Sequence, residues 1–282
     1  MIQACGVGEA WRIPDDMWER IEPLLPAERP HPKGGRPWQP ARQMMDAIFY
    51  VLRTGCQWKA LPRGLGAPST VHERFQHWVE AGVFQRLWMS GLLEYDGRVG
   101  IDWEWQAMDG AMTKAPLGGE STGRNPTDRG KGGAKRSLLT EGRGVPIGLS
   151  VDGANRHDMK LVDRTLASIP VERPLPTPEA QQHLSLDRGY DYDAVRETVA
   201  AYGYTAHICA RGEETTAKRD IPGYRARRRI VERAHSWMNR FRRLLIRWEK
   251  KVDHYVAFLH FACAWIAFRA AGTIAPSTRR AA

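Results

Sequence analysis

The sequence predicts an α/β domain, a mixed sheet with flanking helices, behind a small all-helical domain that resembles a helix-turn-helix. Two observations predict this order. Apolar residues repeat with helical spacing through residues 1–95, whereas from Trp105 short strand-like segments alternate with helical ones. A chain of 282 residues is long enough for one large domain or two smaller ones. We expect domains at 1–95 and 96–272 and a C-terminal tail at 273–282.

The first domain is expected to be helical throughout. Its helices cover about 14–25, 41–55, 69–82 and 84–94. Gly55 marks a typical helix stop, and Ser69 or Thr70 can cap the third helix. A helix, a turn and a short amphipathic helix are typical of a helix-turn-helix whose last helix enters a DNA major groove. A scaffolding bundle would show the same pattern, so the sequence leaves both interpretations open.

The second domain is expected to alternate strands and helices. The strands cover 105–115, 137–140, 145–151, 183–187 and 205–210, and the helices cover 159–169, 192–204, 225–251 and 255–268. Asp109 lies near the end of the first strand, and Asp187 ends the fourth. Catalytic side chains in α/β sheets lie at strand ends, so both aspartates are candidates.

Residues 225–251 contain no Gly or Pro and repeat with helical period, which predicts one long amphipathic helix. One side is apolar and includes Trp237, which we therefore expect in the core. The opposite side is a basic stripe that contains one acid, Glu232. Such a stripe is either a solvated face or the phosphate-binding face of a metal-dependent nucleic-acid enzyme.

Positive charge is concentrated around this segment. The net charge is +10, and residues 211–251 hold 14 Lys and Arg against 5 Asp and Glu. This clustering favours a polyanion partner, with nucleic acid first and an acidic membrane second. The Gly-rich segment 117–136 is expected to be a basic loop whose Arg129, Lys131 and Lys135 approach phosphates, although a plain surface loop needs no such role.

Cysteine usage and hydropathy exclude other classes. The four cysteines stand alone, without CxxC pairs or histidines at ligand spacing, so neither a zinc site nor a disulfide framework is expected. The N-terminus shows no signal-peptide pattern, and the longest apolar run, 255–268, is too short to span a bilayer. We expect a cytoplasmic protein without a membrane segment.

Asp109, Asp187 and Glu232 are far apart in the sequence, so only folding can bring them together. Three carboxylates in one site repel one another unless cations lie between them, and Mg²⁺ or Mn²⁺ prefer such oxygen ligands. Two ions about 3.5–4 Å apart can activate an attacking oxygen and stabilise the leaving oxygen at a phosphodiester. The competing acids are Asp102, Asp128, Asp152, Asp158 and Asp191. Asp158 is better explained as a helix cap, and Asp152 as a turn residue.

Several segments resemble the DDE transposases of bacterial insertion sequences, particularly the families numbered four and five. They are RPW…VLRTGCQWKALP, WVEAGVF, MDGAMTKAP, NPTDRGKGGAKRSLLTEGRGVPIG, ANRHD, LDRGYD and RRRIVERAHSWMNRFRRL. Together they extend over most of the chain from Trp11 to about Phe268. The resemblance implies an RNase H-like catalytic core behind a helical DNA-binding domain. It also implies that Asp109, Asp187 and Glu232 are the three catalytic, metal-binding acids.

The resemblance further implies DNA contacts around the third acid. Arg228 stands at the family's Arg position, but Arg225 replaces its Tyr and Asn239 its Lys, so Arg243 is the candidate for the missing cation. The whole expected DNA-binding set is Arg228, Asn239, Arg243, Arg233, Arg129, Lys131, Lys135, Arg74, His77 and Arg36.

The function implied by this resemblance is that of a DNA transposase, which cuts the ends of its own element and joins the freed 3′-OH to target DNA. It would use two Mg²⁺ or Mn²⁺ ions per active site and bind terminal inverted repeats, target DNA and a second copy of the chain. Two alternatives remain at this level. One is a non-catalytic DNA-binding protein, such as a repressor or a decayed transposase, and the other is an RNase H-like nuclease without strand transfer.

Overall fold

The structure of this chain is a computed structural model. Two residues of the expected DNA-binding set, Arg36 and Arg228, lie outside the part that it describes, as does most of the expected C-terminal tail. The described residues are 8, 11–27, 38–208 and 229–274.

Four helices open the chain where the apolar periodicity predicts them. They are α1 (Asp15–Ile21), α2 (Ala41–Thr54), α3 (Pro68–Glu80) and α4 (Val83–Val99). α2 ends at Gly55, whose φ of 71° is left-handed and suits glycine. A Cβ at Gly55 would lie 3.0 Å from the backbone of Arg242, so glycine also lets the later chain pack against the end of α2. α3 begins slightly earlier than expected, because Pro68 occupies its first turn.

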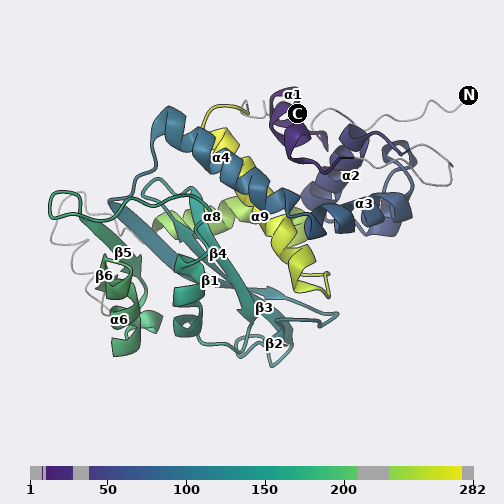
Figure 1. The fold of residues 1–282 in the computed structure, drawn as a ribbon. Helices are drawn as coiled ribbons and strands as arrows, with labels where there is room; N and C mark the ends of the chain where they lie inside the picture. Colours follow the sequence, from purple (N-terminus) through teal and green to yellow (C-terminus); the bar gives the residue numbers. More distant parts are fainter. Residues whose placement is uncertain (1–7, 9–10, 28–37, 209–228, 275–282) are drawn as a thin grey trace, which may run out of the picture.

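The central sheet is mixed. Its strands are β1 (Trp105–Lys114), β2 (Gly123–Arg124), β3 (Gly132–Thr140), β4 (Pro146–Gly153), β5 (Gln182–Leu186) and β6 (Tyr204–Ile208). They lie in the order β4-β3-β1-β5-β6, and the short β2 pairs with the first residues of β3. β1 is antiparallel to β3 and parallel to β5. The expected fold class, a mixed sheet with flanking helices behind a helical region, is confirmed (Figure 1).

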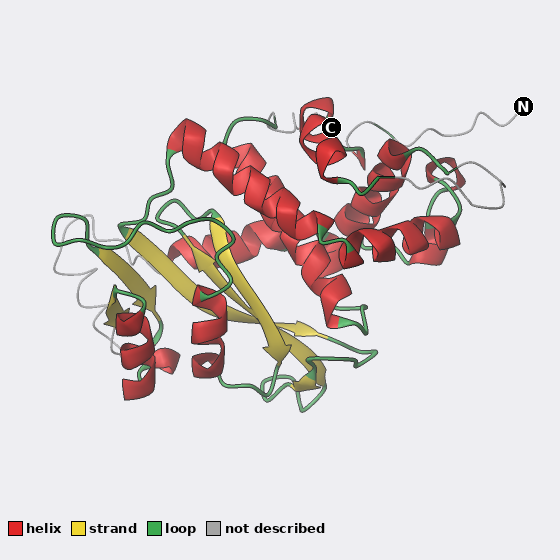
Figure 2. Cartoon of the chain, in the orientation of Figure 1, coloured by secondary structure: helices red, strands yellow, loops and turns green. Residues whose placement is uncertain are grey.

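Helices cover both faces of the sheet. The remaining ones are α5 (Val162–Leu166), α6 (Asp193–Ala201), α8 (Arg229–Met238) and α9 (Val252–Ala270). α5 packs on β3 and β4, α6 on β6, α8 on β1 and β3, and α9 on β4. Figures 1 and 2 show α6 in front of the sheet and α8 behind it, with α9 running alongside α4. Because β3 and β4 are covered on both sides, nearly all their residues are buried.

The basic loop expected at 117–136 is shorter in the structure. β3 begins at Gly132 rather than at Ser137, so Lys135 lies in a buried strand. The cause is the covering of β3 on both faces, which draws a Gly-rich segment of loop-like composition into the sheet.

The prediction of a single long helix over 225–251 is wrong. α8 ends at Met238, and the chain then turns through a 3-10 segment at Arg242–Leu244 and continues without helix to the start of α9 at Val252. The basic stripe is therefore not one continuous helical face.

Buried arginines explain why the helix stops. Arg243 forms a 2.7 Å ion pair with Glu249, and both side chains are almost inaccessible. The Arg247 guanidinium donates to the backbone carbonyls of Glu120 and Ser121, while its backbone N–H donates to the carbonyl of Lys114 at 2.8 Å. These bonds to another part of the chain override a local helical preference, as tertiary contacts often do.

α9 connects the helical region to the sheet. It is buried along most of its length and packs against both α4 and β4. Gly91 of α4 allows a close approach, because a Cβ there would lie 3.2 Å from the Phe268 ring. The buried apolar residues from Ile13 to Ile274 form one cluster. In spite of its apolar character, α9 is not long and apolar enough to cross a membrane, and neither is any other described helix.

We expect Gly91→Val to lower the free energy of unfolding by about 1–3 kcal/mol, because the added side chain forces α4 away from α9. Chemical denaturation measures this loss. Gly97→Ala is the control on the same helix, since no atom outside the helix and the neighbouring residues lies within 4 Å of its Cβ position. Alanine there should stabilise the helix by up to about 1 kcal/mol. Wild-type stability of Gly91→Val would contradict the close packing.

His260 on α9 stacks on Trp88 of α4, with ring centroids 5.1 Å apart. Burial lowers the pKa of His260 to about 4, so the folded protein keeps the ring neutral while the unfolded chain binds a proton below about pH 6.5. The stabilisation is therefore complete above pH 6.5, and about 1–3 kcal/mol is lost as the pH falls towards 4. We expect His260→Phe, which keeps an aromatic stack, to reduce this loss in urea titrations at several pH values. If wild type and His260→Phe lose stability equally as the pH falls, His260 is not the source of this pH dependence.

Candidate active site

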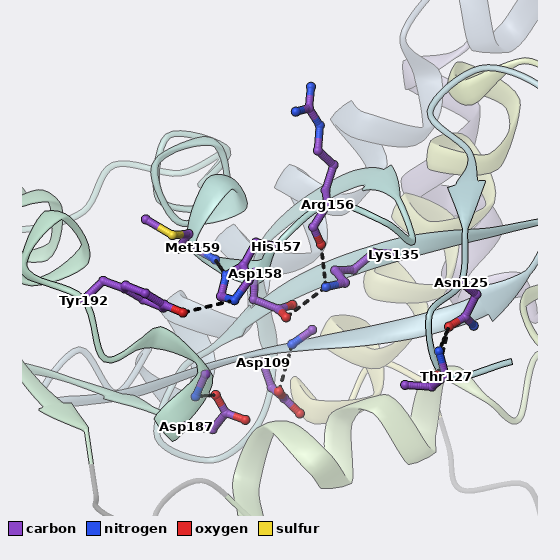
Figure 3. Close-up of polar contacts among 12 residues, drawn as sticks. Asp109, Asn125, Thr127, Lys135, Arg156, His157, Asp158, Met159, Asp187 and Tyr192 are labelled. Carbon is purple, nitrogen blue, oxygen red and sulfur yellow. Dashed lines mark hydrogen bonds and ion pairs between the residues drawn. The ribbon is translucent and has the colours of Figure 1, made fainter. Parts of the chain in front are cut away.

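Two aspartates meet where the parallel pair of β1 and β5 ends. The ladder pairs Ala107 with Ser185, and two residues farther along the two strands stand Asp109 and Asp187. Residues two apart in a strand point to the same face, and neighbouring strands lie about 4.8 Å apart. The two carboxylates therefore project from adjacent strands on one face, and Figure 3 draws them together.

Backbone N–H groups orient both carboxylates. The N–H of Gly110 donates to Asp109 Oδ1 at 2.9 Å, and the N–H of Gly189 donates to Asp187 Oδ1 at 2.7 Å. Asp187 is the residue at which the chain leaves β5 and enters a short 3-10 turn, so this turn supplies its donor. Hydrogen bonds of this kind favour the charged form of a carboxylate.

A third aspartate, Asp158, lies beside this pair and comes from the segment after β4. Its Oδ2 accepts a 2.9 Å hydrogen bond from Lys135 Nζ, which also donates to the carbonyl of Arg156 at 2.7 Å (Figure 3). Its Oδ1 lies 2.1 Å from where a Cβ on Gly110 would be, so only glycine at that position leaves room for it. The sequence assigned Asp158 to a helix cap. The cap is instead His157, whose Nδ1 accepts from the next turn, while the Asp158 carboxylate is turned toward Lys135.

The pKa of the buried Tyr190 hydroxyl is affected by all three aspartates. Tyr190 is 1% exposed. Burial raises its pKa well above the usual value, and the negative charges of Asp158, Asp109 and Asp187 raise it further. The phenol therefore stays protonated and offers a neutral O–H beside three acids.

Glu232 lies on α8 at the border of this site. α8 packs on β1, and Nε2 of its His235 lies 3.4 Å from the backbone carbonyl of Asp109. Glu232 comes three residues earlier, so it lies near the same face of the helix, about 4.5 Å along the axis. Burial, with a smaller effect of the Arg136 charge, lowers the pKa of His235 to about 3, so this ring is neutral. The packing of α8 thus places the third predicted acid about one helical turn from the histidine that contacts the Asp109 backbone.

Within the described ranges, no three His, Cys, Asp or Glu side chains lie close enough together to form a metal site. The pair of Asp109 and Asp187 nevertheless suits a hard divalent cation, because two strands offer it oxygen ligands on one face. Carboxylates without a cation between them repel one another, so a cation is the natural partner of this pair.

Five residues of the expected DNA-binding set are exposed and so placed that a phosphate can reach them. They are His77, Arg129, Lys131, Arg233 and Asn239. Two of them also have partners inside the protein. Arg233 donates to the carbonyl of Arg143 at 2.6 Å, and the amide oxygen of Asn239 accepts from the buried Arg136 at 2.7 Å. The amide group of Asn239 therefore has a structural role on its oxygen side.

Three other residues of that set are buried and already have contacts inside the protein. Arg243 is paired with Glu249 and donates to the carbonyl of Cys56. Lys135 is held by Asp158. Arg74 is 5% exposed and lies against the rings of two tryptophans, at 4.5 and 5.6 Å. A charge that is already neutralised or enclosed by protein has little left to offer a phosphate.

Two protein families match this chain. Residues 105–267 match the family described as transposase DDE domain, and residues 13–88 match a putative transposase of the IS4/5 family. The longer match covers more than half of the chain and includes all three acids. This chain belongs to the DDE-domain transposase family. Membership implies dependence on a divalent metal, and the expected family is confirmed.

Curated proteins that are similar in sequence to this chain include another transposase. The putative transposase for insertion sequence element IS402 of Burkholderia cepacia is 34% identical over 154 residues, which is 53% of this chain and 69% of that protein. The uncharacterized protein y4sN of Sinorhizobium fredii is 32% identical over 101 residues, 36% of this chain and 74% of that protein.

Solved structures of Mos1 mariner transposase are more distant. The catalytic domain matches 67% of this chain and 93% of its own, at 9% identity and a TM-score of 0.28. The paired end complex with Mn matches 88% of this chain and 83% of its own, at 12% identity and the same TM-score. Likeness at this level says nothing about activity, so family membership rests on the sequence matches.

Asp158 and Tyr190 lie beside the two aspartates without having been identified from the sequence, and Lys135, expected to contact phosphate, contacts Asp158 instead. The segments ANRHD and LDRGYD contain two of them, but a motif does not say which way its side chains point. Lys135 was placed in a loop, so its contact with Asp158 could not be inferred.

We expect Asp158→Asn to lower the free energy of unfolding of the transposase by about 1–3 kcal/mol, because it removes the charged partner of a buried lysine. Asp191→Asn is the matched control. Asp191 forms a 2.7 Å ion pair with Arg196, but both side chains are exposed, so the cost should be at most about 1 kcal/mol. Urea denaturation of both variants checks this, and equal losses would contradict a special role for the buried pair.

Proposed function

We propose that this transposase cuts DNA at the ends of its own element and joins the freed 3′-OH to target DNA. The observation that supports this most is the meeting of Asp109 and Asp187 on neighbouring strands, with Glu232 on α8, the helix that packs on β1. The family assignment gives the reaction class.

In this proposal Asp109 and Asp187 hold the metal, with Glu232 completing the site. Divalent ions, Mg²⁺ or Mn²⁺ and two per site, supply activation of the attacking oxygen and stabilisation of the leaving oxygen. The backbone N–H groups of Gly110 and Gly189 keep the aspartates oriented before DNA arrives. Lys135 neutralises Asp158, so a fourth negative charge beside the scissile phosphate is offset.

DNA reaches this site over exposed basic and polar side chains. Arg129 and Lys131 lie in the exposed loop before β3, while Arg233 and Asn239 lie on α8 and just after it. His77 on the exposed part of α3 is a candidate contact for the helical region, which we propose binds the terminal repeat. Arg228 and Arg36 remain candidates on sequence alone. Two DNA ends must be held together, so the active species is at least a homodimer on DNA. Because its substrate is chromosomal DNA, we propose that it acts in the bacterial cytoplasm.

Asp109→Asn tests the chemistry. We expect it to reduce Mg²⁺-dependent cleavage of a labelled element end by at least about 100-fold, since a charge that stabilises the transition state is lost, while binding to that end persists. Asp152→Asn is the matched control: Asp152 also lies in the sheet and accepts a bond from the next N–H, Gly153 at 2.8 Å, but it is outside the site. It should retain cleavage.

The two alternatives predict different results in the same assay. A repressor or decayed transposase would bind the end with strong salt dependence and never cut it. An RNase H-like nuclease would cut without joining the 3′-OH to a second DNA, which a strand-transfer assay detects. Undiminished cleavage by Asp109→Asn would reject the assignment of the acids.

A further inference from the structure

A cavity of about 260 Å³ opens between the end of α2, the turn after α8 and the last turns of α9. Three arginines line it, Arg53, Arg240 and Arg269, one from each segment. Ligand pockets usually measure about 300–1,000 Å³, so this one suits a fragment the size of a single nucleotide or less.

The three arginines have no acidic partner in the ranges that the structure describes. Among the residues that the structure describes, no carboxylate forms an ion pair with any of them, and all three lie around one cavity. Burial lowers the pKa of Arg53, and the charges of Arg269 and Arg240 lower it further, which is the sign of unrelieved repulsion. An anion in the cavity would remove this repulsion, and arginine forks match the oxygens of phosphate.

Aromatic rings form the other walls. Trp237, Phe241 and Trp265 line the cavity, and the Arg53 guanidinium lies 5.3 Å from the Phe241 ring centre and 5.9 Å from that of Trp265. Trp237 was expected in the core, but it is only half-buried. Cations beside aromatic faces are the combination with which proteins bind unpaired nucleotides, because the phosphate meets arginine and the base stacks on a ring.

We propose that this cavity binds one unpaired nucleotide, with its phosphate between Arg53, Arg240 and Arg269 and its base against Trp237 or Trp265. In a duplex the bases are stacked on one another and hidden from such walls, so the ligand is a nucleotide that has left the helix. The proposal deepens the proposed function, because α8 carries both Glu232 and Trp237. A nucleotide at the cavity would then fix the DNA strand relative to the acids.

Calorimetric titration with a deoxynucleoside monophosphate, in EDTA and without DNA, tests the cavity independently of cleavage. Arg240→Ala with Arg269→Ala should weaken binding at least about tenfold. Both residues are exposed, and neither side chain has a hydrogen bond or ion pair in the described part of the chain, so folding should not suffer. Arg242→Ala is the matched control, an exposed arginine near Arg240 that does not line the cavity, and it should bind as wild type. Trp237→Leu should weaken binding, and Trp237→Phe should restore it.

A second arm uses two labelled duplexes of the same sequence, one blunt and one with a single unpaired nucleotide at its end, bound to the Asp109→Asn protein. The protein that keeps the cavity arginines should bind the duplex with the unpaired nucleotide about tenfold more tightly than the blunt duplex. The variant with alanine at both positions should lose this preference while it still binds the blunt duplex.

Three results would overturn the proposal: no nucleotide binding at millimolar concentration, inorganic phosphate binding as tightly as the nucleotide, or equal weakening by Arg242→Ala. Nucleotide binding by a protein that never cuts DNA would instead reject the proposed function and keep the cavity.

Discussion

The register of two parallel strands is the constraint on which the site depends. Because β1 and β5 pair with Ala107 opposite Ser185, an aspartate two residues beyond each must appear on the same face. A slip of one residue in either strand would send one carboxylate to the opposite face. The neighbours serve this pair: Gly110 leaves room for Asp158, Lys135 neutralises it, and α8 contacts the Asp109 backbone through His235.

The sequence predicted the parts of the fold that local patterns encode. Helical spacing and a glycine stop located α2, and an apolar run that ends in an acid located β5. The sequence-based prediction failed where contacts between distant residues determine the backbone conformation. The helical period continues past Met238, but the buried bonds of Arg243 and Arg247 need an irregular backbone there, and no pattern in the sequence reveals their carbonyl and carboxylate partners. The same reason hid the contact between Lys135 and Asp158, which depends on how β3 and the segment after β4 lie in space.

Basic residues in this chain serve two purposes that composition does not separate. The surplus of positive charge suggested a DNA-binding surface, yet Arg243, Arg247 and Arg136 are among the most buried side chains. They bind carbonyls, a carboxylate and an amide, and so hold together segments that lack regular structure. Burial identifies which arginines remain for a polyanion: those of the exposed loops, and the three around the cavity beside α9, whose charges have no carboxylate partner among the described residues.

The contact at Gly91 joins the N-terminal helices closely to the rest of the molecule. With no side chain at that point, α4 and α9 lie tightly together, and the N-terminal helices share one apolar interior with the sheet. In a protein with a hinge at this junction, the N-terminal helices would move relative to the sheet. Here the helices and the sheet share that interior, so in the proposed function a DNA end bound by the helices is cut at a constant number of base pairs from the bound sequence.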